Sequence, residues 1–183
     1  MKIMTNHIVL SAALVAVISI GAPTGASAQK EDDDQLRAIT ARVHGTFQDA
    51  SGGLGVVSGD MTIARFEAVN GSLVAIGRIA GAMADSSGEV LGKVDEELAF
   101  AVSNVASTCN QLRMDLAATD ASVLDVPVHF DQEVAGFDSR EGATPKARPV
   151  LCSVGHLLSR RPAADAIIRA LNDVVAALAA ASP

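Results

Sequence analysis

The stretch DMTIARFEAVNGSLVAIGRIAGAMAD, residues 60–85, places Asn70-Gly71 between two apolar-rich runs. Asn-Gly is the strongest short-range signal for a β-hairpin, because a type I′ turn needs positive φ at both central residues. Residues 61–69 and 72–84 are therefore predicted to form two antiparallel strands. The turn also sets the expected register, which pairs Val69 with Ser72, Ala68 with Leu73 and Phe66 with Ala75.

Alternation of apolar and polar residues predicts four more strands around this hairpin. Their buried faces are expected at Ile39, Val43 and Phe47; at Leu98, Phe100 and Val102; at Leu112, Met114 and Leu116; and at Val126, Val128 and Phe130. The first of these segments also fits a helical period, but its threonine and valine content and Gly45 favour a strand. Pro127 lacks a backbone N–H, which predicts an edge position for the last strand.

The period changes after the proline-containing loop at residues 138–149. Residues 150–158, VLCSVGHLL, are predicted to form a short helix, and Pro162 is expected to be the first residue of a longer one. The longer helix has an apolar stripe at Ile167, Ile168, Leu171, Val174, Val175 and Leu178, and a polar side at Asp165, Arg169, Asn172 and Asp173. We therefore expect an α+β fold, in which an antiparallel meander of about six strands packs against two C-terminal helices.

The N-terminal residues have the three parts of a secretory signal peptide. Lys2 precedes an apolar run at residues 8–20, and the small residues of Ala26-Ser27-Ala28 follow. A permanent membrane anchor is the less favoured alternative, because a spanning helix needs roughly 20 apolar residues. We expect a signal peptide at 1–28, a flexible acidic leader at 29–37 and a single globular domain at 38–183. We expect the protein to be exported from a bacterial cytosol to the periplasm or the extracellular space.

Two cysteines, Cys109 and Cys152, are the only ones in the chain. An even count in an exported protein favours a disulfide bond. A redox-active pair is the weaker reading, since the chain has no C-x-x-C motif and neither thiol is flanked by basic residues. Because Cys152 falls in the first predicted helix, the bond would join that helix to the sheet.

The formal net charge is −7, and the sequence has no cluster of lysine and arginine. Such a chain repels phosphate backbones and anionic lipids, which argues against nucleic acid as a partner. The glycine-rich stretch at residues 51–59 lacks the Lys-Ser/Thr of a phosphate-binding loop. We therefore expect no bound cofactor.

The segment DVPVHFDQE, residues 125–133, is the best candidate for chemistry. In an unbroken strand, Asp125, His129, Asp131 and Glu133 would project from one face, and a histidine with carboxylates can bind zinc. His129, Asp131 and Glu133 are thus candidate metal ligands or catalytic groups. The competing interpretation is a solvated, charged strand that discourages sheet-to-sheet aggregation, and it is the one we favour.

The chain resembles a family of exported bacterial proteins of uncharacterised function. The resemblance covers roughly residues 39 to 178, and its quoted pieces are GDMTIARFEAVNGSLVAIGRIAG at 59–81, CNQLRMDLAATDASVLDVPVHFD at 109–131, VLCSVGHLL at 150–158 and ALNDVVAAL at 170–178. In that family a C-x-x-L-x-L-x-L segment is followed by a leucine-rich helix with a second cysteine. The resemblance implies an exported, disulfide-stapled domain and transfers no functional residues.

Three functional hypotheses follow. The first is a non-enzymatic binding or structural module of the bacterial envelope or the extracellular space, for which a protein partner and an apolar ligand are both open. The second is a metal-dependent or hydrolytic enzyme that uses the face with His129, Asp131 and Glu133. The third is a carrier of an apolar ligand, since a small sheet under a helix can enclose an apolar cavity.

Overall fold

The computed structural model describes residues 38–139 and 147–180. The predicted signal peptide and acidic leader lie outside these residues, and both stay predictions. The elements are β1 (Thr40–Gln48), β2 (Leu54–Val69), β3 (Ser72–Ala84), β4 (Val90–Ser107), β5 (Gln111–Leu116), β6 (Thr119–Val123), β7 (Val126–Phe130), β8 (Glu133–Asp138), α2 (Ala147–Leu158) and α3 (Ala164–Ala179). Within the described ranges, neither helix has the length and apolar character needed to cross a membrane.

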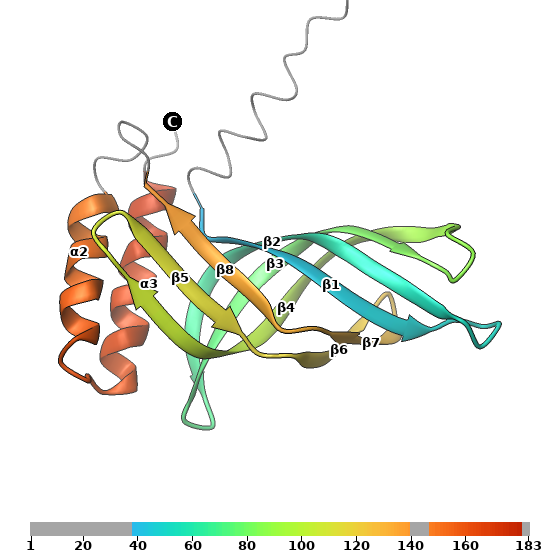
Figure 1. The fold of residues 1–183 in the computed structure, drawn as a ribbon, viewed down its shortest axis with the longest axis horizontal. Coiled ribbons are helices and arrows are strands. Elements are labelled where there is room, and N and C mark those ends of the chain that lie inside the picture. The colour runs from blue at the N-terminus through green and yellow to red at the C-terminus, as the bar shows by residue number, and fades with distance from the viewer. Residues whose placement is uncertain (1–37, 140–146, 181–183) are drawn as a thin grey trace, which may run out of the picture.

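The antiparallel sheet closes on itself. The strand order is β2-β3-β4-β5-β8-β1-β7-β6, and β1 also pairs with β2, so that six strands form a ring (Figure 1). The two helices lie at one end of this ring, which we call the helix end. The opposite end is formed by the turns that join β1 to β2, β3 to β4 and β6 to β7, and we call it the distal end.

The hairpin of β2 and β3 confirms the register predicted from Asn70-Gly71. Val69 pairs with Ser72, and Phe66 pairs with Ala75. Both central residues of the turn have positive φ, 51° at Asn70 and 78° at Gly71, as a type I′ turn requires.

The sheet contains two strands that the alternation did not predict, β6 and β8. Each follows the preceding strand of the sequence after a short break and runs in the same direction: β6 follows β5, and β8 follows β7. The edge position expected for the strand with Pro127 is wrong, because β7 lies between β6 and β1. Pro127 is nevertheless tolerated there, since the pairing of β7 with β1 involves only Phe130 and His129.

Apolar side chains fill the interior of the ring. The alternation predicted for β1, β4, β5 and β7 is confirmed, because one parity of each is buried or partly buried and the other is more exposed, whereas residues 74–77 of β3 are buried without alternation. Phe100 and Phe130 meet at the centre with ring centroids 5.6 Å apart in an edge-to-face arrangement. The interior also contains Val43, Met61, Ile79, Met83, Met114 and Leu116, all 0–1% exposed.

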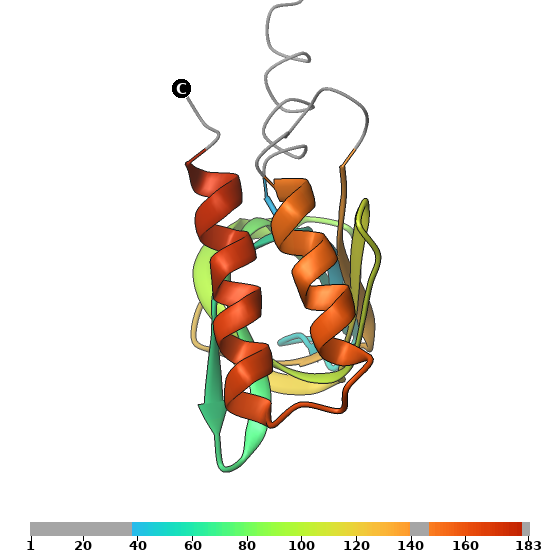
Figure 2. The ribbon, with the colours of Figure 1, turned by 90° about the vertical axis from the view of Figure 1, so that its left-hand side faces the viewer.

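The helices cover the open helix end of the ring (Figure 2). Their buried side chains are Ala147, Leu151, Val154, Leu171, Val174 and Leu178. Cys109, in the turn between β4 and β5, forms a disulfide bond with Cys152 of α2, with the sulfur atoms 2.09 Å apart. The predicted link between sheet and helix is thereby confirmed.

Two details of α3 differ from expectation. The helix begins at Ala164, after the extended residue Ala163, so Pro162 precedes the helix instead of opening it. Asn172, expected on the polar side of the helix, faces the sheet. Its amide Nδ2–H donates to the backbone oxygen of Phe66 at 3.0 Å, and its Oδ1 accepts the N–H of Phe66 at 2.8 Å.

Candidate functional site

The predicted strand with Asp125, His129, Asp131 and Glu133 is interrupted. β7 ends at Phe130 and β8 begins at Glu133, so Asp131 lies in the break, where its N–H donates to the backbone oxygen of His44 at 3.1 Å. Asp125 is in the turn between β6 and β7, with φ of 63°. The candidates therefore do not share a regular strand face.

Each of the two outer-wall histidines is paired with a carboxylate. The Nδ1 atom of His129 lies 2.7 Å from Oδ1 of Asp120, which faces it across the β6–β7 ladder. The Nδ1 atom of His44 lies 3.0 Å from Oε1 of Glu133. The structure thus brings Glu133 to His44 and not to His129, a relationship hidden in the sequence because these residues are 89 positions apart.

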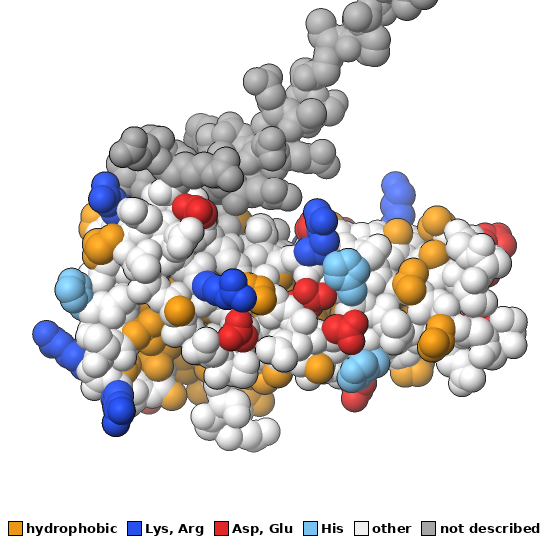
Figure 3. All heavy atoms as spheres, in the orientation of Figure 1, with side chains coloured by type: hydrophobic (Ala, Val, Ile, Leu, Met, Phe, Trp, Pro, Cys, Tyr) orange, Lys and Arg blue, Asp and Glu red, His pale blue; other side chains and the backbone are white. Residues whose placement is uncertain are grey.

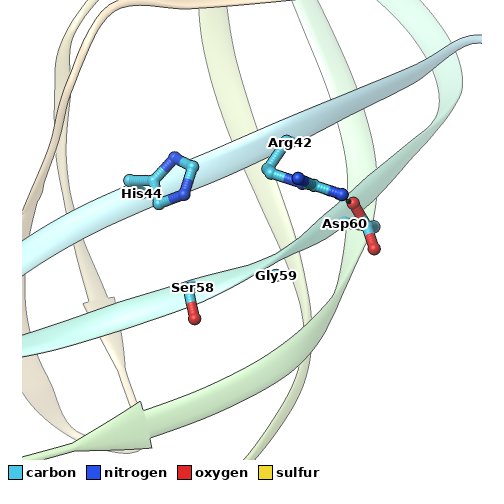
Figure 4. A pocket seen from close by; sticks show the side chains of 5 residues that line it. All are labelled: Arg42, His44, Ser58, Gly59 and Asp60. Atoms are coloured by element: carbon cyan, nitrogen blue, oxygen red, sulfur yellow. Dashed lines mark ion pairs between the residues drawn. The ribbon is translucent and has the colours of Figure 1, made fainter.

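A shallow hollow of about 330 Å³ lies beside His44 on the outer wall (Figure 4). It is lined by Arg42, His44, Ser58, Gly59 and Asp60. The lining comes from two paired strands, since His44 is opposite Ser58 and Arg42 is opposite Asp60. The Arg42 Nε atom is 3.7 Å from Oδ1 of Asp60. Figure 4 shows the Ser58 hydroxyl turned away from His44.

The chemistry open to this hollow is limited. In nucleophilic catalysis by serine, a carboxylate orients a histidine, and the histidine activates the serine hydroxyl. Glu133, His44 and Ser58 are the residues that could take these three places. The His44 side chain is 53% exposed, however, so it is not held in a water-excluded site. Among residues 38–139 and 147–180, no group of three or more histidine, cysteine, aspartate or glutamate residues is arranged to hold a metal ion. The metal-site hypothesis for His129, Asp131 and Glu133 stays a prediction without support from this geometry.

A second hollow, of about 480 Å³, lies along α2. It is lined by Ser153, His156, Leu157 and Arg160. The Ser153 hydroxyl donates to the backbone oxygen of Pro149 within the same helix. Arg160 lies just past the C-terminal end of α2, where a cation offsets the helix dipole, so a structural role accounts for it.

The distal end carries a group of exposed apolar side chains that the sequence reading did not single out. Seven large apolar side chains are exposed among the residues that the structure describes, and five belong to this end: Leu54, Val56, Val90, Leu91 and Leu124. We call these five residues the distal patch. Leu54 is 72% exposed and Val90 63% exposed. Figure 3 shows orange hydrophobic side chains on this end of the molecule.

Strand register explains why these side chains lie together. Val56 on β2 pairs with Ala84 on β3, and Ala84 pairs with Val90 on β4, so the three side chains form one row on the outer face. Leu91 is the extra residue of an irregularity in the β3–β4 ladder. Leu124 extends the patch from the β6–β7 turn, where its Cδ1 lies close to Gly92.

Two matching turns support the distal end. In the turn after β1, the Asp49 Oδ1 atom accepts hydrogen bonds from the N–H and hydroxyl of Ser51 and from the N–H of Gly53. Asp85 repeats this arrangement after β3, with Ser87 and Glu89 as its partners.

A cross-link joins these two turns, because the second oxygen of Asp49, Oδ2, accepts the N–H of Ser86 at 3.0 Å. The hydrogen bond from the Ser51 hydroxyl, followed by those from Ser86 and Gly53, holds the pKa of Asp49 well below its ordinary value. The pKa of Asp85 is lowered in the same way, first by the Ser87 hydroxyl.

The distal end is acidic as well as apolar. Residues 48–56, 84–92 and 123–126 form it, and they contain no lysine or arginine, while the exposed Lys93 follows directly on β4. Their acidic residues are Asp49, Asp85, Glu89 and Asp125. Because hydrogen bonds favour the ionised forms of Asp49 and Asp85, these carboxylates keep their negative charge at neutral pH.

Comparison with known proteins found no matching family model, no matching curated protein and no matching solved structure. The resemblance to exported two-cysteine proteins therefore stays a prediction from the quoted motifs.

Proposed function

We propose that this protein is an exported, non-enzymatic binding module that contacts a protein partner through its distal end. The observation that carries the proposal is the gathering of Leu54, Val56, Val90, Leu91 and Leu124 at one end of the ring. Scattered single apolar residues are ordinary on protein surfaces, whereas a contiguous group of them marks an interaction site.

Three further features support the proposal. The interior is occupied by packed apolar side chains, and the helix end is covered by α2 and α3, so the distal end is the open apolar surface among the described residues. The disulfide bond suits an oxidising compartment outside the cytosol. The signal-peptide pattern at residues 1–28 supports export to the periplasm or the extracellular space.

A comparison of two double variants tests the proposal. Leu54→Ser with Val90→Ser removes apolar surface from the distal end, and Val69→Ser with Val134→Ser removes it elsewhere. All four side chains are exposed, so both variants should fold. After reversible cross-linking in the native host, a discrete protein should co-purify with the wild type and the second variant, and be lost from the first. Equal recovery with both variants would refute the proposal.

Export is tested separately by the mass of the protein recovered outside the cytosol. The proposal predicts a mature chain that begins at Gln29. A full-length chain retained in the cytosol would contradict the export part of the proposal.

A second candidate function is hydrolysis at the outer-wall hollow, and the pairing of His44 with Glu133 at 3.0 Å favours it. In this reading Glu133 orients His44, and Ser58 is the nucleophile after rotation of its side chain. This candidate predicts hydrolysis of an activated ester such as p-nitrophenyl acetate that is lost in Ser58→Ala and His44→Ala and retained in His129→Ala. A rate equal to that of buffer, or equal in all the variants, removes it.

A further inference from the structure

We infer that the distal end binds a cationic, amphipathic segment of a protein partner. This inference rests on the proposed function, since it uses the same surface, and it adds the chemistry of the partner. It is carried by two properties that coincide at the distal end: exposed apolar side chains at the centre, and four acidic residues around them, with the exposed Lys93 as a basic residue at the margin.

The shape of the apolar row suits a narrow partner. Val56 and Val90 lie on strands separated by one other strand, so they are about 10 Å apart across the row. The smaller Ala84 stands between them, which leaves room for a side chain from the partner. A helix has a diameter of about 10–12 Å, and its apolar stripe matches a row of this width.

The charges around the patch select the partner. Glu89 directly precedes Val90, and Asp125 directly follows Leu124, so each flanks an apolar contact. Asp49 and Asp85 add two carboxylates at the tips of the β1–β2 and β3–β4 turns. A segment with leucines on one face and lysines on the margins would bury the apolar row and place its ammonium groups beside these carboxylates.

The same charges disfavour two other occupants. A second copy that met the first distal end to distal end would bring four carboxylates against four others, and this repulsion opposes association. An anionic membrane surface would be repelled in the same way. A cationic segment is therefore the occupant that both properties of the surface fit.

The test uses the mature protein and two synthetic peptides, each about four helical turns long. The first has leucines at helical spacing on one face and lysines on the other; the second has the same composition in an order that spreads the leucines around the helix. Isothermal titration should give a dissociation constant on the order of 10 μM for the first peptide, as in a small transient interface. The second peptide should bind at least tenfold more weakly.

Variants assign the binding to the distal end. Leu54→Ser with Val90→Ser should weaken binding roughly tenfold or more, because the apolar contacts supply the affinity. Glu89→Lys with Asp125→Lys should also weaken it, and should reduce its dependence on sodium chloride. Val134→Ser, on the side wall of the ring, should bind like the wild type.

The inference is overturned by equal binding of the two peptides, or by unchanged binding in the distal variants. Two results in the absence of peptide binding also overturn it. One is a dimer, detected by sedimentation, that the distal variants dissociate. The other is binding of phosphatidylglycerol vesicles that the distal variants abolish. Failure here is distinguishable from failure of the proposed function, because a partner that co-purifies through the distal end without being cationic would contradict only this inference.

Discussion

The side chain of Asn172 forms two hydrogen bonds with the backbone of Phe66, and so takes the place of a neighbouring strand. The paired part of β1 begins at Thr40, opposite Thr62, so the ladder on that side of β2 ends before Phe66. A backbone N–H and C=O left without partners at a half-buried position would be costly. Asn172 satisfies both groups and fixes α3 against β2.

Replacement of Asn172 with alanine should therefore lower the free energy of unfolding by about 1–3 kcal/mol, the cost of leaving a polar group unsatisfied. Urea denaturation followed by circular dichroism measures this change. Asp173→Ala is the matched control, because Asp173 is the next residue on α3 and is exposed; its effect should stay within about 0.5 kcal/mol. Equal effects of the two substitutions would mean that the contact with Phe66 contributes nothing.

Reduction of the bond between Cys109 and Cys152 should destabilise the protein. The two residues are 43 positions apart, and loop-closure entropy gives about 4 kcal/mol for a cross-link of that span. A thermal melt with and without a reductant measures the effect, and thiol labelling of the untreated, unfolded protein should detect no free thiol. Two labelled thiols per chain, or identical melts, would contradict this account of the helix end.

The turn between β6 and β7 offers a substitution with opposite effects on stability and on binding. Leu124 and Asp125 both have positive φ, 51° and 63°, in a turn of the same kind as Asn70-Gly71. A leucine in this conformation costs about 1 kcal/mol, and asparagine tolerates it better. Leu124→Asn should therefore stabilise the protein by up to about 1 kcal/mol, while it removes one side chain from the distal patch.

The reverse substitution in the other turn, Asn70→Leu, is the control for backbone strain. It should destabilise the protein by a similar amount, about 1 kcal/mol, and leave peptide binding unchanged, because residue 70 lies at the helix end. Stability is read from urea denaturation, and binding from the titration described above. Loss of stability in Leu124→Asn would show that packing of the leucine outweighs its strain.

Acidification should lower the stability of the folded protein by protonating Asp49 at the distal end. Its pKa is lower in the folded protein than in the unfolded chain, chiefly because of the Ser51 hydroxyl, so its ionised form contributes stability above about pH 4. That contribution is lost as the pH falls through the folded pKa. Stability should therefore decline below about pH 4, and the decline should be shallower in Asp49→Asn than in the wild type.

Thermal melts across pH 2 to 7, in roughly one-unit steps, measure this difference. Asp173→Asn is the control, since it removes one exposed carboxylate from α3 without touching the turns. If the melting temperatures of the wild type and Asp49→Asn fall in parallel with pH, the hydrogen bonds to Asp49 do not contribute to the pH dependence of stability.

The sequence predicted those features that depend on near neighbours. The Asn70-Gly71 turn, its register, the buried faces of four strands and the helical stretch around Cys152 all follow from local rules, and each is confirmed. The disulfide bond was predictable because only two cysteines exist.

Features that depend on distant segments were not predictable in this way. Closure of the sheet needs β1 to pair on both of its edges, and no local pattern records that. Asn172 reads as a polar-side residue because helical spacing says nothing about an unpaired strand edge nearby. The pairing of His44 with Glu133 depends on the break at Asp131, which interrupts an alternation that otherwise looks regular.

The distal patch is not evident from the sequence for a related reason. Leu54 and Val90 each open a strand after a polar turn that contains glycine, where a single apolar residue forms no recognisable pattern. Only the register of β2, β3 and β4 places them in one exposed group.

The role of the distal end as a contact surface is tested by photo-cross-linking from two matched positions in the native host. A photoreactive amino acid replaces Val90 in the distal patch or Val134 on the side wall, both of which are exposed valines on strands. Irradiation should yield a discrete cross-linked species from position 90 and none from position 134. The same species from both positions, or from position 134 alone, would contradict the assignment of the distal end as the contact surface.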